Sequence, residues 1–186
     1  MKFCNYLPVL LACVVAFCSC HRNTAAKDLI TYVNDPGNGI TQEQDIRDNH
    51  LQLQYIPSTL QVLSVNGSEL SATALQQEKQ KYDSFMYFRF SILNSVYKPA
   101  GDTLNYLNFN MQDDMMLVTD NKDTVPCVFY QKIAGANKFN NEFIVVFEKP
   151  LQEMSDFHFV YTDKVFGLAT RSFPFRRADL DHIPQL

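Results

Sequence analysis

Histidines are the side chains of this sequence best suited to acid–base chemistry at neutral pH. The chain has four, scattered along its length: His21, His50, His158 and His182. No G-x-S-x-G motif supplies a nucleophilic serine for any of them. His158 lies between Phe157 and Phe159 in a segment that alternates like a strand, so it is either a general base or ligand, or an ordinary strand residue. The alternation favours the ordinary strand residue.

A cysteine nucleophile is the second candidate, because the chain contains five cysteines. Four fall within the first twenty residues, at Cys4, Cys13, Cys18 and Cys20. Cys127 is therefore left without an intramolecular disulfide partner in an exported protein. Its neighbours Pro126 and Val128 are not charged, whereas a reactive thiol needs a nearby cation or helix N-terminus. We predict that Cys127 is a small apolar core residue.

Acidic side chains form two short groups, Asp113-Asp114 and Asp179 with Asp181 and His182. A glycosidase needs two facing carboxyl groups, and a zinc site needs closely spaced His or Cys ligands. The spacing supports neither, and a turn and a solvated tail explain the two groups. The sequence thus predicts no catalytic residue, no metal site and no cofactor.

Aromatic side chains are concentrated between residues 85 and 175, which hold 13 of the 15 phenylalanines and 5 of the 9 tyrosines. Most lie at strand spacing, which is typical of core residues. A minority could form an exposed patch that binds a partner. The candidates are Tyr87, Tyr97 and Tyr106, together with Phe139, which stands among asparagines in a polar loop over residues 133–141.

Alternation of apolar and polar residues predicts seven to eight short strands. These cover residues 51–55, 85–92, 107–111, 115–119, 125–131, 143–147, 157–161 and 173–175. Residues 143–147 are apolar at both parities, which indicates a central strand covered on both faces. Pro174 favours an edge position for the last strand.

Helical signals precede most of these strands, over residues 29–33, 58–63 and 66–83. No alternation of strands with helices is visible, which argues against a parallel sheet. We therefore expect a mainly β, β-sandwich-like fold with a small N-terminal helical region.

The first twenty residues carry an export signal, with Lys2 before an apolar run over residues 7–17. This run is shorter than the roughly 20 residues that span a membrane. Ser19-Cys20 follows it and resembles the lipobox of bacterial lipoproteins, in which the cysteine becomes the lipidated N-terminus. Cys18 is the rival site, but Phe17 before it is bulky. An ordinary cleaved signal ending near Ser19 remains the alternative.

The lipobox, together with the segments TYVNDPGNGI, YIPSTLQVL and TVPCVFYQ, is similar to a family of uncharacterised bacterial envelope lipoproteins. The resemblance implies a location in the cell envelope and implies no activity. Because His21, Arg22 and Asn23 follow the cysteine in place of the acidic residues that direct some lipoproteins to the cell surface, we expect an outer-membrane lipoprotein that faces the periplasm. We expect a signal peptide over residues 1–19, a lipidated cysteine and tether over residues 20–28, and one β-rich domain over residues 29–186.

The net charge is −4, and the Lys and Arg residues form no basic cluster of the kind that nucleic-acid binding requires. We therefore expect no nucleic-acid partner. The hypothesis favoured by the sequence is a membrane-tethered, non-catalytic binding or structural module with a protein or glycan partner in the envelope. Two alternatives remain open: a periplasmic hydrolase whose site is assembled from distant residues, and a carrier of small apolar ligands.

Overall fold

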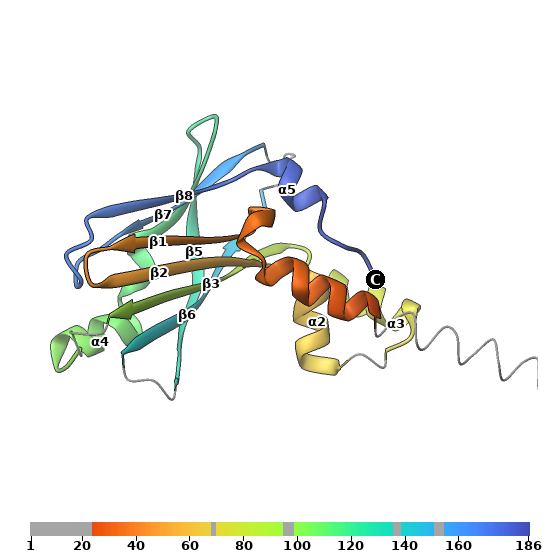
Figure 1. The fold of residues 1–186 in the computed structure, drawn as a ribbon, viewed down its shortest axis with the longest axis horizontal. Helices are drawn as coiled ribbons and strands as arrows, with labels where there is room; N and C mark the ends of the chain where they lie inside the picture. Colours follow the sequence, from red (N-terminus) through yellow and green to blue (C-terminus); the bar gives the residue numbers. More distant parts are fainter. Residues whose placement is uncertain (1–23, 68–69, 95–98, 136–138, 151–154) are drawn as a thin grey trace, which may run out of the picture.

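Eight antiparallel strands form one nearly closed sheet, so the fold is mainly β, as the sequence predicts. The computed structural model describes residues 24–67, 70–94, 99–135, 139–150 and 155–186. The strands are β1 (Thr41–Ile46), β2 (Asn49–Ile56), β3 (Phe85–Asn94), β4 (Met115–Thr119), β5 (Thr124–Ile133), β6 (Asn140–Glu148), β7 (Phe157–Thr162) and β8 (Thr170–Phe175). Their order across the sheet is β1-β2-β3-β6-β5-β4-β7-β8 (Figure 1).

The sheet has two halves that face each other, and β5 belongs to both. Residues 124–126 of β5 pair with β4, while residues 127–133 pair with β6. The half that contains β1, β2, β3 and β6 therefore packs over the half that contains β4, β7 and β8, which accounts for the sandwich-like interior (Figure 1).

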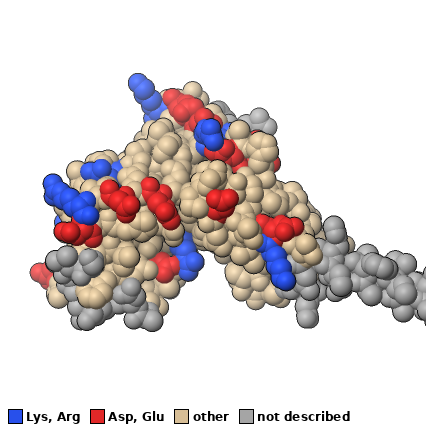
Figure 2. Space-filling view, viewed as in Figure 1, with Lys and Arg blue, Asp and Glu red and all other residues tan. Residues whose placement is uncertain are grey.

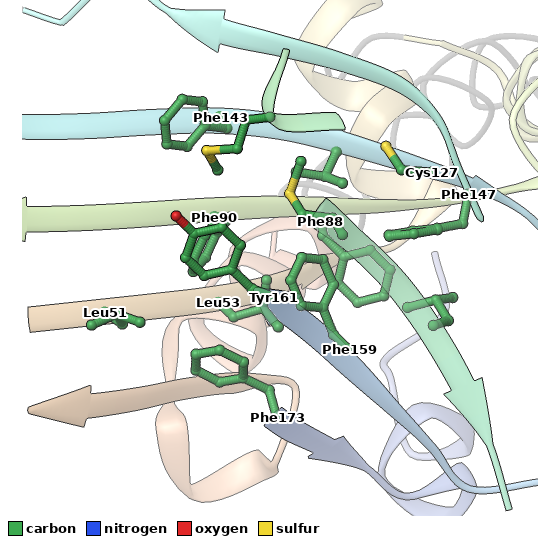
Figure 3. Close-up of a cluster of buried hydrophobic side chains, with 14 of the residues drawn as sticks. Leu51, Leu53, Phe88, Phe90, Cys127, Phe143, Phe147, Phe159, Tyr161 and Phe173 are labelled. Atoms are coloured by element: carbon green, nitrogen blue, oxygen red, sulfur yellow. The ribbon is translucent and has the colours of Figure 1, made fainter. Parts of the chain in front are cut away.

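Phenylalanine rings from both halves fill this interior. The ring centroid of Phe88, on β3, lies 5.5 Å from that of Phe159 and 5.4 Å from that of Phe175. The ring centroids of Phe90 and Tyr161 lie 5.1 Å apart. These rings meet edge-on or tilted, as aromatic pairs prefer (Figure 3). Burial alternates along β3 and β7, and their rings Phe88, Phe90, Phe157, Phe159 and Tyr161 are buried, so the prediction that aromatic residues at strand spacing belong to the core is confirmed for these strands.

The open seam of the sheet lies between its two edge strands, β1 and β8. Gln42 and Gln44 of β1 donate side-chain hydrogen bonds to the backbone carbonyls of Pro174 and Ser172. The backbone nitrogen and carbonyl of Pro174 thus face away from β7. The N–H that proline lacks is therefore not needed for the hydrogen bonds between β7 and β8. The predicted edge position of this proline is confirmed.

Five helices and two short 3-10 turns complete the described chain. They are the helix over residues 24–34, α2 (Ser58–Asn66), α3 (Ala72–Gln80), α4 (Asp102–Phe109) and α5 (Arg177–Asp181), with η1 (Pro36–Asn38) and η2 (Met111–Asp114). None of the helices in the described ranges is long and apolar enough to cross a membrane.

The helix over residues 24–34 begins inside residues 20–28, which the sequence predicts to be a tether. Its buried residues Leu29 and Val33 pack with Ile40 and Ile183. The hydroxyl of Thr41 donates a hydrogen bond of 2.6 Å to the carbonyl of Val33, which closes the end of the helix against β1. This helix is therefore part of the folded body.

The strand predicted over residues 107–111 is wrong, because α4 and η2 occupy this segment. Leu107 of α4 and Met111 of η2 are both fully buried, and they lie four residues apart in the chain. Phe109, which a strand would have buried with them, is 72% exposed. A short run with apolar residues at every second position also contains the four-residue spacing of a helix.

Strand β1 lies outside the strands that the sequence predicts. Its sequence, TQEQDI, shows almost no alternation of apolar and polar residues. Only Thr41, at the start of the strand, is buried. β1 pairs with β2 through six residues and is held in place by that pairing rather than by a hydrophobic face of its own.

Acidic and basic side chains are interspersed on the face seen in Figure 2, without an area covered by Lys and Arg alone. Several charged side chains of the described residues are paired, as in the ion pair of 2.7 Å between Arg177 and Asp181. This distribution agrees with the small net charge of −4.

Candidate functional site: an apolar groove on the outer face of the sheet

A groove of about 510 Å³ lies on the outer face of β3, β6 and β5, beside α2. Apolar side chains from three neighbouring strands form most of its surface: Phe85 and Tyr87 of β3, Ile144 and Val146 of β6, and Val128 and Phe129 of β5. A volume in this range is typical of ligand sites. The groove lies outside the packed interior, which is filled by the phenylalanine rings.

A β-bulge places two large apolar residues side by side on this outer face. The register shifts between Cys127, which is opposite Phe147, and Phe129, which is opposite Val146. Val128 is the extra residue, so Val128 and Phe129 both point outward before Tyr130 turns inward to stack on Phe143. Val128 is 40% exposed and Phe129 is 49% exposed.

Ordinary strand alternation supplies the rest of the groove. Phe85 and Tyr87 are the outward residues of β3, and their rings lie 6.4 Å apart. Ile144 is the outward residue of β6 beside them. β6 is a central strand between β3 and β5, as predicted, but its outer face lines a surface groove instead of being covered.

Polar groups lie at the margins of the groove. Gln61 of α2 and Glu148 at the end of β6 are its two non-aromatic polar lining residues. Farther along the same face, Arg89 of β3 forms an ion pair with Glu142 of β6. None of the ion pairs of the described residues includes Glu148, so this carboxylate stands at the groove without a cationic partner.

A separate cluster of ionisable groups holds α4 and η2 against the sheet. Asp114 accepts a hydrogen bond from the hydroxyl of Tyr106 and an ion pair of 2.6 Å from Lys164. The hydroxyl of Tyr161 donates to Asp163 at 2.7 Å. Burial and then these carboxylates raise the pKa of both tyrosines, so the phenols stay neutral at physiological pH. The cluster is a hydrogen-bonded support for the fold.

The sequence predicts a turn at Asp113 and Asp114, and both residues lie in the 3-10 turn η2. Asp113 is exposed, but Asp114 is buried, because it accepts from Tyr106 and pairs with Lys164. Asp179 and Asp181 belong to α5, where each pairs with an arginine of the same helix or its N-cap.

The described histidines lie apart from the groove. His158 is exposed on β7, and its Nδ1 lies 2.9 Å from the hydroxyl of Ser172 on β8. His50 pairs with Asp45, and His182 contacts the carbonyl of Ala178. Among the described residues, no group of three or more His, Cys, Asp or Glu side chains is arranged to hold a metal ion.

Cys127 is a buried free cysteine, which confirms the prediction that it belongs to the core. Its thiol donates to the carbonyl of Phe129 at 3.1 Å, which supports the bulge. Burial raises the pKa of the Cys127 thiol to about 11.

We expect Cys127 to react slowly with thiol reagents in the folded protein, because the thiolate is the reactive form. With a pKa of about 11, the thiolate is a small fraction of the thiol at pH 8. The unfolded thiol ionises at lower pH, so the free energy of unfolding should fall as the pH rises from about 9 to about 11. Labelling followed by mass spectrometry, in native buffer and in urea, measures this difference. Equal rates in both would show an accessible, activated thiol.

The residues that the sequence nominated for partner binding do not form one site. Tyr87 lines the groove, whereas Tyr106 bonds to Asp114 on another part of the molecule. Phe139 is half-buried, and its carbonyl accepts a hydrogen bond of 3.0 Å from the backbone N–H of Asn94. Tyr97 and Cys20 lie outside the described residues.

Sequence reasoning missed Val128, Phe129 and Ile144 as surface residues. The available signal was the pair Val128-Phe129 itself, since two successive large apolar residues within an alternating strand break its parity.

Comparison with known proteins finds similarity to a few solved structures only at the level of the fold. No protein-family profile and no curated protein sequence matches the chain. Among solved structures, a DUF4426 family protein from Pseudomonas aeruginosa is 12% identical, with a TM-score of 0.41, over 74% of this chain and 93% of that one. A protein of unknown function from Burkholderia pseudomallei is 10% identical, with a TM-score of 0.42, over 88% of this chain and 89% of that one. The chain is thus similar to bacterial proteins to which no activity is assigned.

Proposed function

We propose that the protein is a non-catalytic binding module, held at the cell-envelope membrane by a lipid on Cys20, and that its groove binds an apolar segment of a partner protein. The observation that carries the proposal is the β-bulge, which exposes Val128 and Phe129 next to Tyr87 and Ile144. Bulges commonly re-aim side chains next to functional sites.

The composition of the groove favours a protein partner. An apolar centre with a polar margin is the arrangement found at protein–protein interfaces. Glu148 adds a negative charge at the margin that is unpaired within the described chain. A segment with one or two large apolar side chains over Phe129 and Tyr87, and a Lys or Arg near Glu148, matches both features.

A groove on the surface suits a side chain or short segment better than it suits a carried small molecule. Carriers enclose most of their ligand. Here the sheet interior is occupied by packed rings such as Phe88 and Phe159, which lie 5.5 Å apart. Of the pockets in the described part of the chain, the groove of about 510 Å³ on the outer face is the one with large apolar side chains from three neighbouring strands.

The tether that we propose is short. The described chain is helical from residue 24, so at most residues 21–23 lie between a lipidated Cys20 and the folded body. Three extended residues span about 10 Å. The lipid would therefore hold the domain close to the membrane surface and leave partners to approach from the side or from above.

Loss of one central groove side chain should abolish most of the binding. Phe129→Ser removes an exposed ring and should lower the yield of crosslinks to the partner in intact envelopes by tenfold or more, as for a residue that contributes about 2 kcal/mol. Phe109→Ser is the matched control, because Phe109 is also exposed but lies on α4. An equal loss in both variants would point to a non-specific effect of surface hydrophobicity.

The hydrolase alternative is tested on the same preparations. Turnover of a generic ester, phosphate or glycoside substrate that disappears in His158→Ala would contradict the non-catalytic proposal. Unchanged crosslinking in Phe129→Ser would contradict the location of the site in the groove.

A further inference from the structure

A second pocket lies at the opposite end of β5 and β6 from the groove. Its volume is about 300 Å³. Asn108 of α4, Lys132 and Ile133 of β5, and Asn141 of β6 line it, together with the small residues Ala134 and Gly135. Whereas the groove is mostly apolar, this pocket has polar side chains on several sides.

The side chains of Lys132 and Asn141 lie on the same face of the sheet. Lys132 is opposite Phe143, and Asn141 precedes Phe143 by two residues on β6. Side chains two residues apart on a strand share a face, so both polar groups lie on the inner face that Phe143 occupies. The sheet therefore brings a cationic and an amide donor to the end of an otherwise apolar interior.

Neither donor has a hydrogen-bond or ion-pair partner among the described residues. Asn141 is 2% exposed, and its Nδ2 has no hydrogen-bond acceptor, which is rare for a buried amide. The ion pairs of the described residues involve other cations than Lys132. Loss of hydration lowers the pKa of Lys132, as is expected for an ammonium group without a counter-charge.

We propose that this pocket binds a small monocarboxylate, whose oxygens accept hydrogen bonds from Nζ of Lys132 and Nδ2 of Asn141. A single negative charge balances the single lysine, whereas a phosphate dianion would carry a second charge that no other cation of the described lining balances. Ile133 and Ala134 provide apolar surface for a short aliphatic body. This site is separate from the groove and does not depend on the function proposed for it.

Titration with propionate tests the proposal on the full chain in detergent, with the Asn141 side-chain amide observed by NMR. We expect a saturable shift of that resonance at millimolar propionate. Lys132→Met should weaken binding at least tenfold, while Lys132→Arg should restore most of it because the charge and donors return. Lys149→Met is the control, since Lys149 is exposed and is not part of the pocket. It should change the affinity less than twofold.

Other results would overturn the proposal. No saturable shift up to about 50 mM would mean that the pocket holds only water. Inorganic phosphate binding as tightly as propionate at equal ionic strength would exclude the monocarboxylate class. An unchanged affinity in Lys132→Met, with the melting temperature retained, would exclude Lys132 as the binding group.

Discussion

Replacement of Phe88 by alanine is expected to lower the free energy of unfolding by about 3–5 kcal/mol, enough to unfold much of a marginally stable domain. Phe88 is fully buried on β3 and contacts rings from both halves of the sheet. The centroids lie 5.7 Å away for Phe147, 6.3 Å for Phe157 and 5.4 Å for Phe175. Its removal leaves a cavity at the centre of the interior that rigid neighbouring strands cannot close.

Phe109→Ala is the matched control, because it removes the same atoms from a side chain that is 72% exposed. We expect a change below about 0.5 kcal/mol there, as for most surface substitutions. Urea unfolding followed by circular dichroism measures both variants. Equal destabilisation of the two would contradict the packing of the two halves around Phe88.

Replacement of Cys20 by alanine should release the protein from the membrane. Each buried methylene of an acyl chain contributes about 0.8 kcal/mol, so several chains make dissociation negligible until they are removed. Metabolic labelling with a fatty acid, followed by separation of membrane and supernatant fractions, measures the change. We expect loss of both the label and the membrane fraction.

Cys18→Ala serves as the control, since Cys18 lies two residues away in the same segment. It should leave labelling and fractionation unchanged, because bulky Phe17 precedes it. Label retained in Cys20→Ala and lost in Cys18→Ala would move the anchor to Cys18. Absence of label in the unaltered protein would favour a cleaved signal without a lipid.

The parts of the fold that were predictable from the sequence are those in which one face of a strand is buried. β3 shows this, since Met86, Phe88 and Phe90 alternate with outward residues and are all buried. β1 was not predictable, because its polar residues are held by pairing with β2 and by side-chain bonds to β8. α4 was misassigned, since Leu107 and Met111 satisfy both the helical and the strand period over so short a run.

The candidate site was predictable only in part. Tyr87 was nominated as an outward aromatic residue of a strand, and it lines the groove. Its neighbours Val128 and Phe129 reach the groove through a register shift opposite Val146, which depends on long-range pairing between β5 and β6. The second pocket likewise depends on which residues of β5 and β6 are opposite each other, because Lys132 and Asn141 are nine positions apart in the chain.

Site-specific photocrosslinking in intact cells tests the binding groove most directly. A photoreactive phenylalanine analogue replaces Phe129, and in a control it replaces Phe109. We predict an adduct from position 129 to an apolar segment of one protein, with a Lys or Arg within a few residues, and a lower yield when Glu148→Gln is added. An adduct to lipid or glycan, or the same adducts from position 109, would contradict a protein-binding groove.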